Sequence, residues 1–148
     1  MKSEKFLTLV NQVISNSNSE TFEAARLEWK ITAYHTVNIE ENISCICGQP
    51  HLVNLYEITN IYNKNSIYPL GSECITKFEY DDLNYQRKLI TTGKKRFINK
   101  GKRFDGLTYE EICNTYPDYL EFLMKHATKS KYIKLIEYYK FIKNIKLQ

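Results

Sequence analysis

Glycine and proline are scarce in this 148-residue chain, with 5 and 3 copies, and long apolar runs are absent. So few backbone breakers argue against a long flexible linker. No run approaches the length of about 18 apolar residues that would indicate a membrane-spanning helix, so we expect no membrane partner. Hydrophobic residues make up 43% of the sequence, which is enough for a packed core and argues against wholesale disorder. The length suits one ordinary domain or two small ones.

A secretory signal is also lacking near the start. Residues 1–15 are charged and amphipathic, whereas a signal peptide has an unbroken apolar stretch. The 4 cysteines are therefore expected in a reducing cytoplasm, where disulfides are rare. Closely spaced cysteines in that compartment indicate metal binding rather than a disulfide.

The net charge of +4 conceals a division along the chain. Residues 1–84 carry 6 Lys and Arg against 11 Asp and Glu, a net charge of −5, and residues 85–148 carry 15 against 6, a net charge of +9. A basic part joined to an acidic part predicts an anionic partner for the basic part. We therefore expect an N-terminal metal-containing module over 1–84 and a basic helical module over 85–148.

Hydrophobic spacing and turn signals predict an α+β fold, with helices flanking a small zinc-pinned β-hairpin and a helical basic C-terminal part. Helices are expected at 4–15, at about 20–30, after Cys74, in part of 83–100, and at about 130–146. A strand is expected at 31–37, and a hairpin around the turn Asn63-Lys64-Asn65 with Ser66–Leu70 as its second strand. Two short helices should begin at the capping box Thr108–Glu111 and at Pro117.

The pattern with the clearest chemistry is Cys45-Ile46-Cys47-Gly48, followed by Cys74 after the expected hairpin. Structural zinc takes four tetrahedral ligands and favours a mixture of thiolate and imidazole. Cys45 and Cys47 are too close to lie on neighbouring helical turns, so a tight turn at Gly48 is expected, with backbone N–H groups facing the thiolates. The cofactor predicted from these residues is a structural Zn²⁺ ion.

The fourth zinc ligand is less constrained by spacing. His51 is nearest and completes the predicted set Cys45, Cys47, His51 and Cys74. His35 and His126 are the other imidazoles, and Cys113 is a fourth thiol whose simpler interpretation is a small buried hydrophobe. The alternatives to a structural site are three unligated cysteines, or a catalytic zinc with an open position, for which Glu73 is the neighbouring acid.

The stretch Cys45-Ile-Cys47-Gly48 through Tyr56-Glu-Ile58 to Gly71-Ser-Glu-Cys74-Ile75-Thr-Lys-Phe78 resembles a zinc-ribbon-like module of small phage and mobile-element proteins. A histidine often directly follows the Cys-x-Cys-Gly turn in that pattern, whereas here Gln49 stands there and His51 lies two residues further on. The resemblance implies a phage or mobile-element origin, and hence the cytoplasm of a host cell.

A second resemblance covers Gly101-Lys-Arg-Phe104-Asp-Gly106-Leu-Thr108-Tyr109-Glu-Glu-Ile112 and Pro117-Asp-Tyr119-Leu120-Glu-Phe122-Leu123. This stretch is similar to the small C-terminal domain of exodeoxyribonuclease X-like proteins, which is an accessory to DNA-processing enzymes rather than the nuclease. The acidic metal-binding motifs of the nuclease half have no counterpart in this chain. The resemblance therefore implies a DNA-associated role without the cleavage activity.

The densest basic stretch, Lys94–Arg103, predicts a nucleic-acid contact surface. Its cations would neutralise phosphates, and the interleaved Phe97 would stack on unpaired bases. The alternative is a solvated lysine-rich face with Phe97 simply buried. The predicted contact residues are Lys94, Lys95, Arg96, Phe97, Lys100, Lys102 and Arg103.

Together these features predict a non-enzymatic, zinc-containing accessory protein that binds nucleic acid. The alternative is a phage-type inhibitor, similar in role to anti-CRISPR proteins, that binds a host defence or CRISPR nucleoprotein complex. A metal-dependent nuclease using Glu79, Asp81 and Asp82 is a third reading, although an acidic pair at a helix start is ordinary capping. No glycine-rich phosphate loop and no Ser-His-Asp order accompanies these residues.

Overall fold

The computed structural model of the chain describes residues 3–126 and 130–147 and has an α+β fold, as the sequence predicts. The chain divides into two compact units: unit 1, Met1–Arg87 with Ile145–Gln148, and unit 2, Lys88–Asn144. The expected boundary followed residue 84. The structure also groups the last residues of the chain with unit 1 rather than with the basic part.

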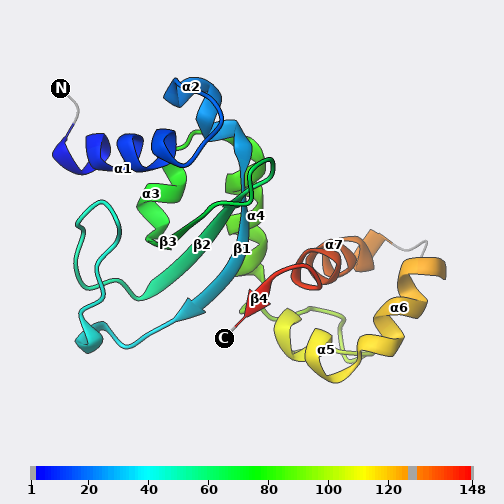
Figure 1. Cartoon of the computed structure of the whole chain (residues 1–148). Coiled ribbons are helices and arrows are strands. Elements are labelled where there is room, and N and C mark those ends of the chain that lie inside the picture. The colour runs from blue at the N-terminus through cyan, green and yellow to red at the C-terminus, as the bar shows by residue number, and fades with distance from the viewer. Residues whose placement is uncertain (1–2, 127–129, 148) are drawn as a thin grey trace. The chain divides into compact units, whose positions relative to one another are not determined.

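Unit 1 is built on a small sheet with the strand order β3-β2-β1-β4 (Figure 1). Strands β1 (Trp29–Thr36), β2 (Asn54–Asn60) and β3 (Ser66–Leu70) are antiparallel, and the short β4 (Lys146–Leu147) pairs parallel to β1. The expected hairpin is thus formed by β2 and β3. The pairs Ile31–Ile58 and Ile58–Ile67 align apolar residues of all three longer strands on one face, which fixes the register.

Helices flank this hairpin, as expected (Figure 1). Helix α1 (Glu4–Ser15) buries Leu9 and Val13, and Ser3 caps its N-terminus. The short α2 (Phe22–Ala25) and α3 (Ser72–Thr76) follow, and α4 spans Asp81–Thr92. The rings of Phe6, Phe22 and Phe78 form a chain of contacts at centroid distances of 5.8 and 5.9 Å, which joins α1 and α2 to the segment after α3.

A buried carboxylate in unit 1 joins the loop after α1 to the end of β2. Glu28, in the 3-10 turn Arg26–Glu28, is 4% exposed and accepts hydrogen bonds from the backbone N–H groups of Asn18 and Ser19 and from the side-chain amide of Asn60. Burial alone would raise the pKa of Glu28, but hydrogen bonding from the Ser19 side chain, from Asn60 and from the two backbone N–H groups lowers it to about 2. The ionised side chain therefore fastens the loop after α1 to the end of β2.

Unit 2 is helical, with α5 (Tyr109–Thr115), α6 (Pro117–His126), the 3-10 turn Ser130–Tyr132 and α7 (Ile133–Ile142). The capping box predicted at Thr108 and Glu111 is confirmed, because each side chain accepts a hydrogen bond from the other residue's backbone N–H. Buried residues from these helices and from the segment before α5 form its core: Phe97, Phe104, Ile112, Cys113, Leu120, Leu123, Tyr132, Leu135, Tyr138 and Tyr139.

Two element boundaries differ from the sequence prediction. The helix expected at about 20–30 ends at Ala25, and Trp29 begins β1 instead. Its indole is buried and donates a hydrogen bond from Nε1 to Ser17 Oγ at 2.9 Å. The last helix ends at Ile142, because Lys146–Leu147 pair with β1. In both places pairing between distant strands prevails over local helical spacing.

Candidate metal centre and candidate nucleic-acid interface

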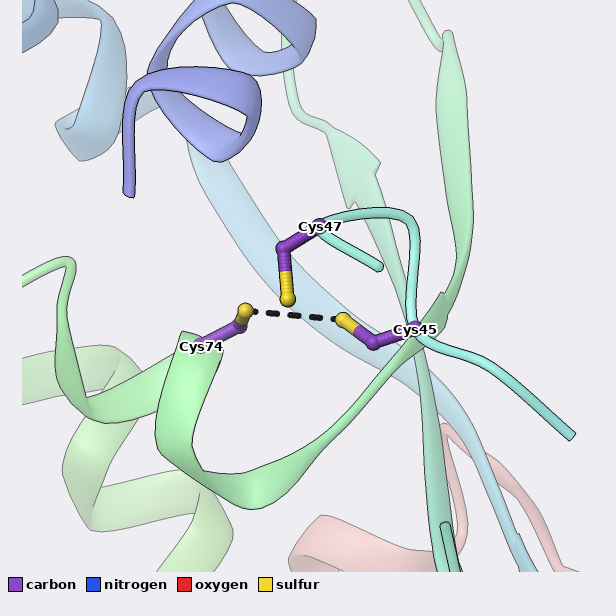
Figure 2. A group of neighbouring side chains, drawn as sticks. All are labelled: Cys45, Cys47 and Cys74. Atoms are coloured by element: carbon purple, nitrogen blue, oxygen red, sulfur yellow. Dashed lines mark hydrogen bonds between the residues drawn. The ribbon is translucent and has the colours of Figure 1, made fainter. Parts of the chain in front are cut away.

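Three of the predicted ligands, Cys45, Cys47 and Cys74, converge in unit 1. Their Sγ atoms all lie within 4.8 Å of one another, and all three side chains are buried. Figure 2 shows the sulfurs pointing toward a common centre, two from one loop and one from helix α3. Residues that are far apart in the sequence thus present three soft donors to a single point, and this cluster could hold a metal ion.

The backbone around the cluster explains this convergence. Gly48 has a φ of 100°, and its N–H bonds to the carbonyl of Cys45 at 2.8 Å, so the chain turns within four residues and brings the two thiols to one side. The N–H of Ile46 bonds to the Pro69 carbonyl at 3.1 Å, which fastens this loop to β3. Cys74 lies shortly after the end of β3, in the first turn of α3.

Hydrogen bonds polarise the thiols. The Sγ atoms of Cys74 and Cys45 are 3.4 Å apart, and the N–H of Gly71 donates to the Cys45 sulfur at 3.5 Å. The hydrogen bond from Cys74 is the largest cause that lowers the pKa of the Cys45 thiol below its ordinary value, and the backbone N–H groups of Cys47 and Gly71 add to it against the opposing effect of burial. As the donor, Cys74 has its pKa raised. The cluster therefore stabilises a thiolate, the form that binds metals.

A cavity of about 240 Å³ adjoins the three sulfurs, and its wall includes His51, Gln49, Glu73 and two lysines. His51 is exposed, has a φ of 57°, and lies outside the group of converging sulfurs. Lys5 closes part of the wall by donating from Nζ to Gln49 Oε1 at 2.6 Å. The structure thus places the predicted fourth ligand beside the cluster without bringing it into contact.

The other candidates for the fourth ligand are engaged elsewhere. His35 lies 2.9 Å from the hydroxyl of Tyr68 through Nε2, and His126 packs against Phe122 at a centroid distance of 4.7 Å. Cys113 is buried in the core of unit 2, where burial raises the pKa of its thiol to about 12. Of the three histidines, which all fall within the described ranges, His51 alone lines the cavity.

The basic segment, Lys94–Arg103, is an ordered turn of unit 2 rather than a helix. The N–H of Gly106 donates to the carbonyl of Phe97 at 2.8 Å, and the N–H of Phe97 donates to the carbonyl of Leu107 at 2.7 Å. The chain therefore folds back on itself. The carboxylate of Asp105 accepts from the N–H groups of Asn99 and Gly101 at 2.7 and 2.9 Å, which also lowers the pKa of Asp105. These contacts fix the backbone that carries the predicted cations.

All six predicted cations of the basic segment are exposed: Lys94, Lys95, Arg96, Lys100, Lys102 and Arg103. Arg96 donates to the carbonyl of Gly106 at 2.6 Å, and the guanidinium of Arg103 lies 4.3 Å from the ring centroid of Tyr119. Within the described ranges, the four lysines have no side-chain hydrogen bond or ion pair to any residue. No direct contact with a residue in the described part of the chain therefore compensates their charges.

The prediction for Phe97 requires correction. Its side chain is 2% exposed and lies parallel to Tyr132 at a centroid distance of 5.9 Å, inside the core of unit 2. A ring in this position cannot stack on a base, and it serves instead as the anchor of the basic segment. The sequence could not distinguish the two roles, because an aromatic residue among lysines fits both.

Exposed aromatic residues near the basic segment lie on α6 and directly before it, whereas the sequence predicted α6 only as a packing element. Tyr116 and Phe122 are 41% and 52% exposed, and Tyr119 lies between them in sequence. The three-residue spacing of these aromatic residues in the sequence could have predicted this arrangement, because it places Tyr119 and Phe122 on one side of α6. The buried Leu120 and Leu123 occupy another side of the same helix.

The acidic residues considered for a nuclease do not converge. Asp81 and Asp82 are exposed in the first turn of α4, and Asp82 accepts a hydrogen bond from the hydroxyl of Tyr80 at 3.0 Å. Over residues 3–126 and 130–147, the three cysteines form the one group of potential metal ligands, and Glu79 with this pair does not form another.

Among residues 3–126 and 130–147, none of the helices combines the length and the apolar composition that a membrane span requires. Comparison of the chain with protein-family models, curated proteins and solved structures found no match.

Proposed function

We propose that this chain is a non-enzymatic accessory protein that binds nucleic acid through the basic segment of unit 2 and is stabilised by a metal ion in unit 1. The observation that carries the proposal is a hydrogen-bonded turn that presents four exposed lysines, whose side chains pair with no residue among those that the structure describes. Lysines that form no ion pair can bind phosphates without first breaking a contact within the protein. Their binding releases the counterions condensed on the nucleic acid. The charge of unit 2 agrees with this role, since it holds 13 Lys and Arg against 6 Asp and Glu.

The metal that best suits the cysteine cluster is zinc. Three buried thiols favour a soft or borderline cation, and a fully protein-bound structural site would take His51 as its fourth ligand. Zinc bound in this way would join the loop of Cys45 and Cys47 to the start of α3 and would contribute directly to the folding energy of unit 1. Its role in this proposal is structural, not catalytic.

The experiment that tests the proposal compares two triple charge reversals by fluorescence anisotropy with a labelled oligonucleotide. One variant replaces Lys95, Lys100 and Lys102 with Glu. Each phosphate contact contributes about 0.7 to the slope of log K against log salt concentration. Losing three contacts therefore predicts binding that is about 100-fold weaker at about 0.1 M salt.

The matched control replaces Lys88, Lys134 and Lys140, which are also exposed lysines, and it changes the net charge by the same amount. It should bind within a few-fold of the unaltered protein. Equal losses in both variants would mean that only overall charge matters, and the basic segment would then not be the interface. Absence of binding by the unaltered protein would favour the alternative proposal, an inhibitor that docks on a host nucleoprotein complex.

A further inference from the structure

A row of aromatic side chains begins at Tyr116, the residue before α6, and continues along α6 in unit 2. We define this aromatic row as Tyr116, Tyr119, Phe122 and His126. Tyr119 and Phe122 are stacked, with ring centroids 5.8 Å apart and an interplanar angle of 29°. Phe122 then meets His126 at 4.7 Å. The rings of Tyr119, Phe122 and His126 thus contact one another in succession along α6.

The packing of unit 2 does not account for the outer members of this row. From α6, Leu120 and Leu123 pack into the core and are at most 5% exposed. By contrast, Phe122 is 52% exposed and His126 is also exposed. A half-exposed phenylalanine on the solvent side of an otherwise amphipathic helix costs hydration free energy without a matching gain in the core. Such a ring therefore suits contact with another molecule.

The row is joined directly to the basic segment. The guanidinium of Arg103, the last cation of the segment, lies over the ring of Tyr119 at 4.3 Å. Its neighbour Phe104 is buried and contacts the rings of Tyr116 and Tyr119 at centroid distances of 5.1 and 5.5 Å. Cations and exposed rings are consequently held side by side by one packed aromatic group.

We propose that the aromatic row is a stacking surface for the unpaired bases of a single-stranded nucleic acid whose phosphates lie on the basic segment. This inference rests on the proposed function and names its ligand class. Proteins that hold single strands combine a cationic track with aromatic rings, because every base has a π-face that a ring can cover. A duplex offers the same phosphates but keeps its bases stacked on one another, so the aromatic row adds nothing to duplex binding.

The test uses Phe122→Ala, with Phe122→Tyr as the conservative variant and Ile133→Ala as the matched control. Ile133 is 54% exposed and lies at the start of α7 in the same unit. Labelled 20-nucleotide strands of oligo-dT and oligo-U and a mixed-sequence DNA duplex are the probes, and circular dichroism melting verifies that each variant folds.

We expect Phe122→Ala to weaken single-strand binding by about fivefold or more, the loss of one base–aromatic stack. Its salt slope and duplex affinity should stay unchanged, and Phe122→Tyr and Ile133→Ala should bind normally. The two single strands distinguish DNA from RNA as the source of the bases.

Two results would overturn the inference while leaving the proposed function intact. One is unchanged single-strand affinity of Phe122→Ala when the triple lysine reversal still weakens binding about 100-fold. The other is an equal loss on duplex and single strands, which would mean that the row does not recognise unpaired bases. If the unaltered protein bound none of the probes, the inference and the proposed function would fail together.

Discussion

Individual cysteines in this chain have two different environments. Cys45, Cys47 and Cys74 share one centre with polar backbone groups and a cavity beside it, whereas Cys113 is surrounded by the core of unit 2. Local spacing was enough to predict this difference, because a Cys-x-Cys pair followed by glycine is typical of a metal-binding turn. Spacing could not place His51, since its distance from the sulfurs depends on the path of a loop with left-handed residues.

At the residue scale, Cys45→Ser should remove the metal and destabilise unit 1. We expect about one zinc per chain in the unaltered protein and much less in the variant, measured by elemental analysis. Because the energy of a zinc site is folding energy, the melting temperature of unit 1 should fall by at least about 10 °C. The one tryptophan, Trp29, is buried in unit 1 and reports its unfolding by fluorescence.

Cys113→Ala is the control for this prediction, since it removes the thiol that lies in the other unit. Its metal content should equal that of the unaltered protein. Equal metal content and equal melting of Cys45→Ser and the unaltered protein would refute the metal site.

Elements with strong local signals agree with the sequence prediction, and those that depend on distant partners do not. Helix α1 has helical apolar spacing and a serine cap, and α5 has a capping box, so local chemistry specifies both. The hairpin of β2 and β3 was marked by its Asn-Lys-Asn turn. By contrast, the two-residue β4 has no local signal, because it exists only through pairing with β1. The core position of Phe97 likewise depends on contact with Tyr132, far away in the sequence.

A prediction at the element scale concerns Glu28, which connects the loop after α1 with the end of β2. Glu28→Gln places an amide where the carboxylate accepts from two backbone N–H groups and from Asn60. We expect the free energy of unfolding to fall by about 1.5–3 kcal/mol at pH 7, the value of hydrogen bonds to a charged group. Urea unfolding followed by Trp29 fluorescence measures this loss, and the exposed Glu23→Gln is the control.

This loss should depend on pH with a definite sign. The pKa of Glu28 is lowered in the folded protein from an ordinary value of 4.5 to about 2. A lowered pKa stabilises the fold fully above pH 4.5, and the contribution disappears as the pH falls from there toward 2. The stability difference between Glu28→Gln and the unaltered protein should therefore shrink in this range. A difference that is already absent at pH 7 would show that the carboxylate does not hold the loops.

At the scale of the whole molecule, charge and metal chemistry are divided between the two units. Unit 1 carries the cysteine cluster and has 8 Lys and Arg against 11 Asp and Glu, whereas unit 2 has 13 against 6. The sequence alone revealed this division, because charge counts need no structure. The joining of the aromatic row to the basic segment could not be predicted in the same way, since it depends on how Phe104 packs between them.

The most direct test of this account is the salt dependence of binding between the unaltered protein and a labelled single-stranded oligonucleotide, measured by anisotropy from low to physiological salt. Four to six exposed cations on phosphates, at about 0.7 each, predict that log K falls against log salt with a slope of about −3 to −4. Binding with a slope near zero, or no binding at low salt, would contradict the claim that the basic segment holds a nucleic acid.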